Sequence, residues 1–399
     1  MPNLLMIHEV IGPHNAIGKV AESDLRIALN AGYNVTVISK IFDSDTKSCV
    51  KWHPLYVPPR LFYWQWTTAR RYIKQALARA RAESKFDIIH AHQPQVADLA
   101  DVFQCHFLTR VAAERHCLEE RKDLRSRFLR LQQQGVLHAE DKCFRNWNPN
   151  TWMLYDSALT QEEFHRLYGK CPLEQVLVYD FPPLRIATPE DRAAARKKFL
   201  PNVALASRQC SDAPIVVGYL GGMQERKGYK RLLAALKDAP DIHLLFAGSH
   251  TENFSPPPEL TGRITPLGLV SDTPNFYAAC DVLLVPSLFE PLGLVAFESA
   301  ARGTPVIATP EVGALPHLLE FNAGEKWNPT ESVPPLIRQV AANRAAYQPG
   351  IQRMAEALSF TNYGKNLLAI YNKVLARTAG VSPAVRRAHA QTTITSQGA

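Results

Sequence analysis

The sequence predicts an α/β protein made of two Rossmann-like, doubly wound domains that face each other across a cleft. Short apolar strands alternate with helical segments in two successive blocks, and the proline-rich turn at 181–183 separates the blocks. The chain has 399 residues, of which 46% are hydrophobic and 21% charged, so it contains enough apolar material for two ordinary domains.

The first block begins with a β-α-β unit. The apolar run 4–7 predicts a strand, a loop rich in Gly, Pro and Asn follows, and helical spacing over 19–30 leads into a second strand at 35–39. Three further short strands are expected at 88–90, 152–154 and 176–178. Since parallel strands need crossover helices, this block predicts a parallel sheet.

The second block repeats the alternation. Strands are expected at 215–219, 243–247, 282–285 and 306–308. Helices are expected at 229–237, 274–279 and 294–302. The predicted organisation is therefore an N-terminal domain at 1–180, a C-terminal domain at 181–358, a helix at 359–377 and a disordered tail at 378–399, where the apolar period ends.

Several protein classes are excluded by composition. No run reaches the ~18 uncharged apolar residues of a membrane-spanning helix, because the longest candidate ends at Glu290. The seven cysteines form no C-x-x-C pair, so neither a disulfide framework nor a thiolate zinc site is indicated. The first strand lacks the basic start and cleavage site of a leader, and a cytoplasmic protein is expected.

The loop from Gly12 to Gly18-Lys19 stands between the first strand and the first helix. It resembles a Walker A loop, but it has five residues between its glycines and Val20 where a magnesium ligand is needed, so an ATP-hydrolysing loop is not expected. Two interpretations stay open: a helix start that meets a phosphate, and a plain turn.

Two polar pairs follow strands of the first block. Asp43 and Asp45 form a D-x-D pattern, for which we expect a solvated turn rather than a metal site. His90 and His92 lie on one face of an extended strand. With no third ligand near them in the sequence, zinc is not expected, and both a contact to a polar ligand and a structural role remain open.

The second block carries more specific motifs. Gly222, Arg226 and Lys227 follow a buried strand and bring two cations to its carboxyl end, which suits a diphosphate. Glu290 and Glu298 stand eight residues apart around the start of a largely apolar helix. Because burying two carboxylates among apolar residues is costly without partners, this pair predicts a ligand rich in hydroxyl groups.

This E-x7-E segment, followed by a G-TPV strand and preceded by the R-K-G loop and an H-A-H strand end, resembles the family-4 retaining glycosyltransferases of the GT-B fold. Within that family the chain looks most similar to bacterial lipopolysaccharide-core glycosyltransferases. The resemblance implies an acceptor-side N-terminal domain, a nucleotide-sugar-binding C-terminal domain and a last helix that crosses back onto the N-terminal domain.

The resemblance also implies roles for individual residues. Glu298 would bind the ribose and Glu290 would face the donor sugar, while the pair Arg226 and Lys227 would hold the diphosphate. The loop of Gly18 would meet the donor phosphate or the acceptor. The remaining residues would touch the sugar, phosphates or base: His92, Gly222, Val270 and the backbone amides of Gly293, Leu294 and Val295. Gly222 stands where many members have arginine, so that charge is assigned to Arg226.

The expected function is transfer of a sugar, from a UDP-sugar, to a hydroxyl of a glycan or lipid-linked saccharide, with retention and as a hexosyltransferase. Neither a metal nor an organic cofactor is expected. A nucleotide-sugar epimerase and a non-catalytic nucleotide-sugar-binding scaffold are the alternatives.

The surplus of positive charge lies in one segment. Nine basic residues against one acidic residue occur between Asp45 and Asp87, which accounts for the whole formal charge of +8. On a helix within 60–85, the cations at 70, 74, 81 and 85 form one stripe flanked by apolar residues at 66, 73 and 77. We expect either a helix packed on its own sheet or one lying on an anionic membrane surface at the cytosolic face, and no nucleic acid partner.

Overall fold

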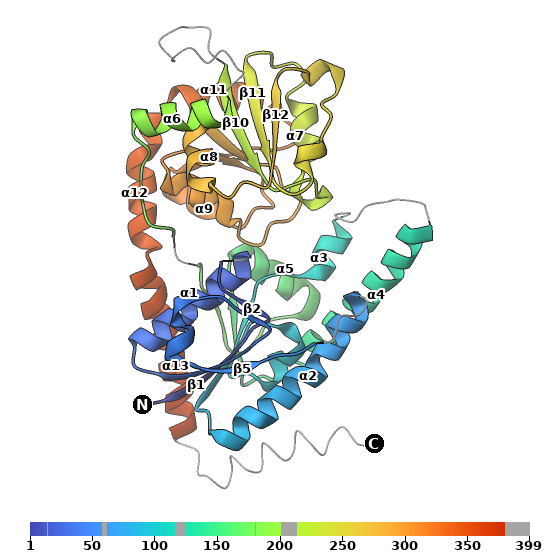
Figure 1. The fold of residues 1–399 in the computed structure, drawn as a ribbon, viewed down its shortest axis with the longest axis vertical. Helices are drawn as coiled ribbons and strands as arrows, with labels where there is room; N and C mark the ends of the chain where they lie inside the picture. Colours follow the sequence, from blue (N-terminus) through green and yellow to red (C-terminus); the bar gives the residue numbers. More distant parts are fainter. Residues whose placement is uncertain (14, 58–61, 116–123, 180, 201–213, 380–399) are drawn as a thin grey trace.

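The computed structural model describes residues 1–13, 15–57, 62–115, 124–179, 181–200 and 214–379. The chain folds into two α/β domains, and helices α12 (Gln348–Ala357) and α13 (Phe360–Ala379) run along one side from the C-terminal to the N-terminal domain (Figure 1). Across those ranges, no helix has the length and apolarity that spanning a membrane requires.

The N-terminal domain is built on a seven-stranded parallel sheet with the order β5-β3-β1-β6-β7-β8-β9. Its strands are β1 Asn3–Ile7, β3 Asn34–Ser39, β5 Lys51–Pro54, β6 Ile88–Ala91, β7 Val102–Cys105, β8 Trp152–Tyr155 and β9 Glu174–Val176. Its helices are α1 Ala16–Asn30, α2 Phe62–Glu83, α3 Thr109–Glu114, α4 Leu124–Arg145 and α5 Ala158–Tyr168. The short strands β2 Val10–Ile11 and β4 Ile41–Phe42 pair separately.

The C-terminal domain has a six-stranded parallel sheet with the order β12-β11-β10-β13-β14-β15. Its strands are β10 Ile215–Leu220, β11 Ile242–Ala247, β12 Ile264–Gly268, β13 Val282–Val285, β14 Val306–Ala308 and β15 Gly324–Lys326. Its helices are α6 Pro189–Phe199, α7 Tyr229–Ala235, α8 Thr273–Ala279, α9 Leu294–Ala301, α10 Leu315–Glu320 and α11 Pro334–Ala342.

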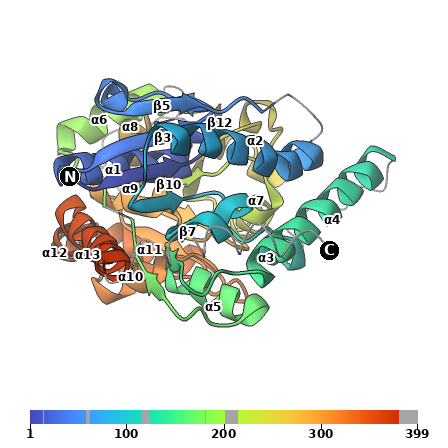
Figure 2. The ribbon, with the colours of Figure 1, turned by 90° about the horizontal axis from the view of Figure 1, so that it is seen from below.

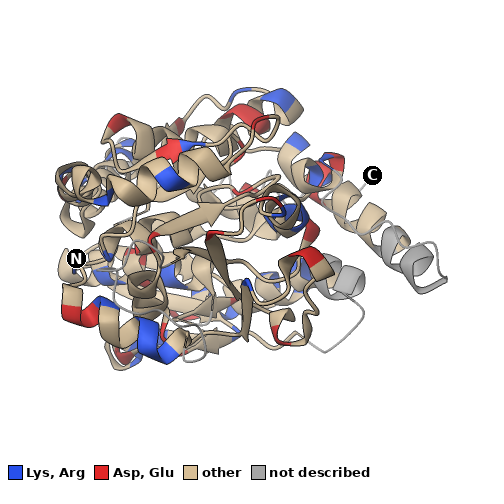
Figure 3. Ribbon diagram, turned by 90° about the horizontal axis from the view of Figure 1, so that it is seen from above, with Lys and Arg blue, Asp and Glu red and all other residues tan. Residues whose placement is uncertain are grey.

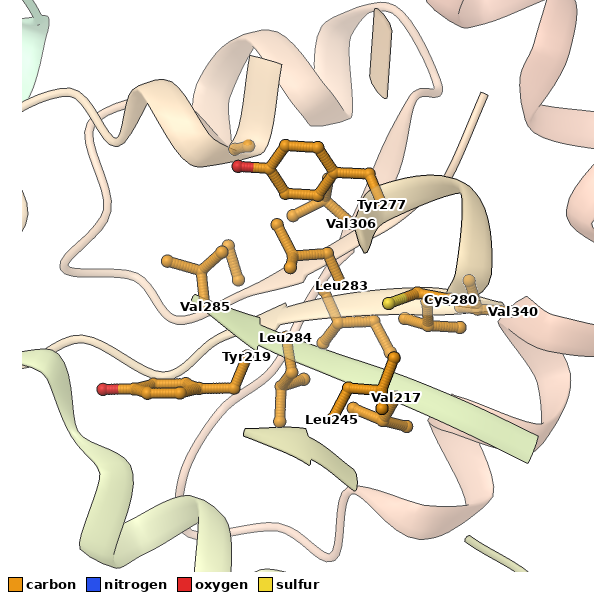
Figure 4. Close-up of a cluster of buried hydrophobic side chains, with 14 of the residues drawn as sticks. Val217, Tyr219, Leu245, Tyr277, Cys280, Leu283, Leu284, Val285, Val306 and Val340 are labelled. Carbon is orange, nitrogen blue, oxygen red and sulfur yellow. The ribbon is translucent and has the colours of Figure 1, made fainter. Parts of the chain in front are cut away.

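The two domains have separate cores. One apolar cluster surrounds the C-terminal sheet, and Figure 4 shows part of it, with Val217 and Leu245 from the strands and Tyr277 from α8. Two other clusters cover the two faces of the N-terminal sheet. Tyr363 and Tyr371 of α13 belong to one of them, and α13 lies beside α1 (Figures 1 and 2). The last helix therefore packs on the N-terminal domain.

The predicted fold class is confirmed, with differences in its elements. The strand expected at 176–178 lies at Glu174–Val176. The structure adds β2, β4, β5, β7, β12 and β15, which the sequence pattern did not indicate. Helix α13 continues to Ala379, two residues past the expected end. Residues 380–399 of the predicted disordered tail lie outside the described residues.

The basic helix α2 is packed into its own domain. Ile73 and Leu77, expected beside the cationic stripe, are buried in the core, and α2 packs against α4. Arg70 forms a two-pronged ion pair with Asp98 at 2.6 and 2.7 Å, so it does not belong to an open stripe. The side chains of residues 61–67 lie outside the described residues. Ile73 and Leu77, which were expected to face lipid, therefore belong to the hydrophobic core of the N-terminal domain.

Surface charges elsewhere are mixed in sign. Seen from above in Figure 3, basic and acidic residues are interspersed over the C-terminal domain. This distribution agrees with a chain whose charge surplus is concentrated in the segment that contains α2.

Candidate active site

Three of the predicted site residues meet at the carboxyl end of the C-terminal sheet. Lys227 Nζ donates to Glu290 Oε2 at 2.5 Å, and Arg226 Nη1 donates to the same oxygen at 3.3 Å. The three side chains are only 14–26% exposed. Two cations thus converge on one carboxylate in a partly desolvated place, where electrostatic interactions are stronger than in water.

The turn that carries the two cations is docked against the end of β13. The amide of Leu288 donates to the carbonyl of Arg226 at 2.7 Å. Gly228 has φ +70°, and a Cβ there would lie 1.7 Å from the carbonyl oxygen of Pro286. Only glycine permits both this conformation and this approach, which explains the R-K-G sequence in structural terms.

Glu298 lies on helix α9. The residue before this helix, Gly293, adopts a left-handed backbone conformation with φ 90°. Oε1 of Glu298 accepts a hydrogen bond from Lys19 Nζ at 3.1 Å, and its Oε2 accepts one from the Tyr277 hydroxyl at 2.7 Å. Burial, with Glu298 nearby, raises the pKa of Tyr277 well above its usual value. The Tyr277 phenol therefore stays protonated and holds Glu298 as an acceptor.

The first turn of α9 faces the same place. Leu294 and Val295 are its first residues, and amides at this position have no acceptor inside the helix and carry the positive end of the helix dipole. Val295 lines a small pocket together with Lys227, Gly221 and Ser287. A negatively charged ligand would meet both backbone N–H groups and a cation there.

The N-terminal domain reaches this site through residues that the sequence analysis missed. The Ser157 hydroxyl donates to the carbonyl of Pro291, and Arg115 Nη1 donates to the carbonyl of Leu288 at 3.3 Å. The Arg226 guanidinium lies 5.5 Å from the centre of the Phe107 ring. The available signal was the position of Ser157, just beyond the carboxyl end of β8, where ligands of parallel sheets bind.

Asp156 is a carboxylate near this site that the sequence analysis also missed. Burial raises its pKa from 3.8 to about 8, and the charge of Glu290 adds to this rise. Its Oδ2 lies 3.9 Å from Nδ1 of His106. A carboxyl group that keeps its proton near neutral pH can hold or release a proton close to the site.

The other predicted residues occupy separate places. The carbonyl of Gly222 accepts a hydrogen bond from the Tyr219 hydroxyl at 2.7 Å. The amide of Gly18 donates at 2.6 Å to Oδ1 of Asn15, the residue that caps helix α1. Val270 is half-buried in the turn after β12. The His92 side chain is fully buried and pairs with His106 at 2.9 Å. Their ligand contacts stay predictions.

The D-x-D turn does not join the site. Asp45 is 76% exposed and pairs with Arg26 at 2.5 Å, which lowers the pKa of the Asp45 carboxyl. This geometry agrees with the expected solvated turn.

Comparison with known proteins places these features in a wider group. Residues 214–336, most of the C-terminal domain, match the family described as "Glycosyl transferases group 1". The lipopolysaccharide core biosynthesis glycosyltransferase LpsE of Rhizobium meliloti is 37% identical over 108 residues, which is 26% of this chain and 32% of LpsE. These matches support the family predicted from the sequence motifs.

Solved structures share the whole fold. WaaG, a glycosyltransferase involved in lipopolysaccharide biosynthesis, has a TM-score of 0.70 at 15% identity over 92% of this chain and 99% of its own. Anabaena HepE in complex with UDP-glucose has a TM-score of 0.66 at 17% identity over 93% and 99%. The chain spans about a third of the length of the first curated relatives that it matches. The GT-B fold is thus shared along nearly the whole chain, whereas the closer sequence similarity lies in part of it.

Proposed function

We propose that this chain, which carries a glycosyltransferase group 1 domain at 214–336, is a retaining glycosyltransferase. It transfers a hexose from a UDP-sugar to a hydroxyl of a glycan or lipid-linked saccharide, in the synthesis of lipopolysaccharide or another cell-surface polysaccharide. The observation that carries this proposal is the convergence of Arg226 and Lys227 on Glu290, beside the N-terminus of α9.

The proposed chemistry follows from where charge develops. When the glycosidic bond to the diphosphate breaks, negative charge grows on the leaving group. Arg226, Lys227 and the first amides of α9 are positive groups held in place before the reaction, so they stabilise the transition state more than the ground state. These groups supply the positive charge that a metal would otherwise supply, so we propose a metal-independent transfer without an organic cofactor.

The two carboxylates have separate roles in this proposal. Glu298 binds the ribose hydroxyls. To do so, it must give up its hydrogen bond with Lys19 or with Tyr277 and accept one from the ribose instead. Glu290 faces the donor sugar while Arg226 and Lys227 turn toward the diphosphate. We take UDP as the nucleotide because HepE, which shares the fold, is described in complex with UDP-glucose.

The retaining course is part of the same proposal. The acceptor hydroxyl attacks from the face that the diphosphate leaves, and an oxygen of the leaving phosphate takes the hydroxyl proton. Lys227 and Arg226 hold that phosphate in place, so they position the group that accepts the proton. An anomer-resolved NMR spectrum of the product tests this course: an inverted anomer refutes it.

Donor binding and turnover together test the function. Thermal shifts should be screened with UDP-, GDP- and ADP-sugars, since a ligand at 100 times its dissociation constant stabilises the fold by roughly 2.7 kcal/mol. We expect a UDP-sugar to give the shift, and UDP release that depends on an added saccharide acceptor. Conversion of the donor to a different sugar without an acceptor would identify an epimerase. Binding without any turnover would identify a scaffold.

We also propose that the protein acts at the cytosolic face of an anionic membrane, through the exposed cations of the 60–85 segment rather than through apolar insertion. Arg71, Lys74 and Lys85 are exposed, and each cation near an anionic surface contributes roughly 1 kcal/mol. Binding should weaken as salt shortens the Debye length.

Co-sedimentation with phosphatidylglycerol vesicles tests this second proposal. The triple variant with Arg71, Lys74 and Lys85 changed to Gln should remain in the supernatant while the wild type pellets. A control that removes the same charge from the exposed lysines at 197, 326 and 365 should pellet normally. Equal loss by both variants, or binding that salt does not weaken, would exclude a specific role for this segment.

A further inference from the structure

A group of buried metal-binding side chains lies in the N-terminal domain. Asp24 of α1 and His90 of β6 are fully buried, and His92, just beyond β6, is 4% exposed. One ligand atom from each lies within 4.8 Å of the other two. In the described part of the chain this is the one group of three or more such residues found at metal-binding spacing.

A hydrogen bond holds the other polar atom of each of these three side chains. The Tyr371 hydroxyl lies 2.8 Å from His90 Nδ1, and His106 Nε2 lies 2.9 Å from His92 Nδ1. The Tyr363 hydroxyl donates to Asp24 Oδ1 at 2.5 Å. Such outer partners fix the ring orientation of metal-ligating histidines and orient ligating carboxylates.

These bonds engage Nδ1 of both histidines, so Nε2 is the ring atom that each histidine can offer to an ion. His92 Nε2 lies 3.5 Å from Asp24 Oδ2. Nε2 of His90 and of His92 are buried and have no hydrogen-bond partner among the described residues. Buried polar atoms without partners are costly, and a bound ion would satisfy both nitrogens at once.

We propose that Asp24 Oδ2, His90 Nε2 and His92 Nε2 bind one Zn²⁺ ion that has a structural role. Two imidazoles and a carboxylate form a known three-residue ligand set for zinc. The fourth ligand is water, because the group at metal-binding spacing does not include His8, whose ring centre lies 5.4 Å from that of His92.

The ion would join three parts of the molecule. It ties α1 to the carboxyl end of β6, and Tyr363 and Tyr371 connect both to α13. It is separate from the sugar transfer proposed above, which draws its positive charge from Arg226 and Lys227. It replaces the sugar contact predicted for His92, because the ion and His106 together engage both nitrogens of that ring. Because the metal is measured directly, this inference and the proposed function can fail independently.

Metal analysis of the full-length protein, purified without a histidine tag, is the first test. We expect about one zinc per chain, a lower Tm after treatment with a chelator, and recovery of the Tm on adding Zn²⁺ alone. Replacement by Co²⁺ should produce the visible absorption of a tetrahedral site. A protein that retains no zinc, and whose Tm and visible spectrum do not respond to Zn²⁺ or Co²⁺, refutes the proposal; bound iron instead overturns the choice of metal.

Variants locate the ion. His90→Asn and Asp24→Asn should lose the zinc, whereas His243→Asn, which removes a buried histidine from the other domain, should retain it. Tyr371→Phe should weaken zinc binding by about 10- to 100-fold, the usual effect of losing an outer partner. Full zinc in His90→Asn would refute the assignment. If the ligand variants do not fold, the Co²⁺ spectrum of the wild type and the zinc affinity of Tyr371→Phe decide.

Discussion

Lys227→Gln is the sharpest test of the proposed transfer. The Lys227 ammonium lies 2.5 Å from Glu290, its side chain is 17% exposed, and it lines the pocket beside the α9 N-terminus. If it stabilises the leaving diphosphate, its removal eliminates a preorganised positive group where charge develops. Loss of one such donor lowers kcat by about 10² to 10³, or roughly 2.7–4 kcal/mol of transition-state stabilisation.

The assay is steady-state release of UDP with saturating acceptor, measured together with donor affinity. We expect kcat to fall much more than donor binding weakens, because the interaction strengthens in the transition state. Lys230→Gln is the matched control: Lys230 lies on the adjoining helix, is 65% exposed and pairs with Glu225. Its kcat should remain near that of the wild type.

A second variant separates two explanations of a slow Lys227→Gln enzyme. Lys227 could act only by neutralising Glu290, in which case Lys227→Gln combined with Glu290→Gln should recover the rate. If Lys227 acts on the leaving group, the double variant stays at least as slow as the single one. Recovery of kcat in the double variant, or a normal kcat in Lys227→Gln, would refute the reasoning.

Three further predictions concern single contacts. Lys19→Gln should tighten UDP binding by up to about fivefold in calorimetry, because the variant removes an ion pair that competes with the ligand for Glu298. An ion pair this exposed contributes at most about 1 kcal/mol, which sets the limit. Weaker binding would show that Lys19 itself contacts the ligand. Gly228→Ala should lower the Tm by several degrees in a thermal scan, since its Cβ would overlap the Pro286 carbonyl; an unchanged Tm would contradict this geometry. Burial lowers the pKa of His243 to about 4, so between pH 6.5 and 4 only the unfolded chain gains a proton there, and the free energy of unfolding decreases as the pH falls. In chemical denaturation, His243→Gln should lose less of its unfolding free energy over that pH window than the wild type does. An equal decrease in both proteins would contradict the assignment.

The sequence predicted the central strands better than the edges of the sheets. The edge strands are β5, β9, β12 and β15; three of them were missed and β9 was displaced by two residues. Edge strands are half-solvated and tolerate charge and proline: β5 reads Lys-Trp-His-Pro, and β12 contains Pro266. Edge strands therefore have apolar runs too short to predict a strand, whereas central parallel strands are buried on both faces and have continuous apolar runs. The central strand β7 was missed because its polar Gln104, although buried, interrupts the pattern.

The candidate site was predictable where its residues are close in sequence or share a strand end. Arg226, Lys227 and Glu290 follow neighbouring strands, so the parallel topology alone brings them together. Contacts between the domains, such as Lys19 with Glu298, were not predictable, because they depend on how the two sheets are placed. Sequence spacing also offered no third ligand for the histidine pair and argued against zinc, because Asp24 is distant in the sequence and only the packing of α1 beside β6 brings it to the histidines.

Helix α1 connects the two proposals. Lys19 and Asp24 lie five residues apart on α1, about 7.5 Å along its axis. The first reaches Glu298 of the C-terminal domain, and the second accepts the hydroxyl of Tyr363 from the helix that returns from that domain. Helix α1 of the N-terminal domain therefore makes both the contact with Glu298 and the contact with Tyr363. An ion that fixes Asp24 against β6 would hold α1 in place. It would thereby also fix the position from which Lys19 reaches Glu298, the residue proposed to bind the ribose.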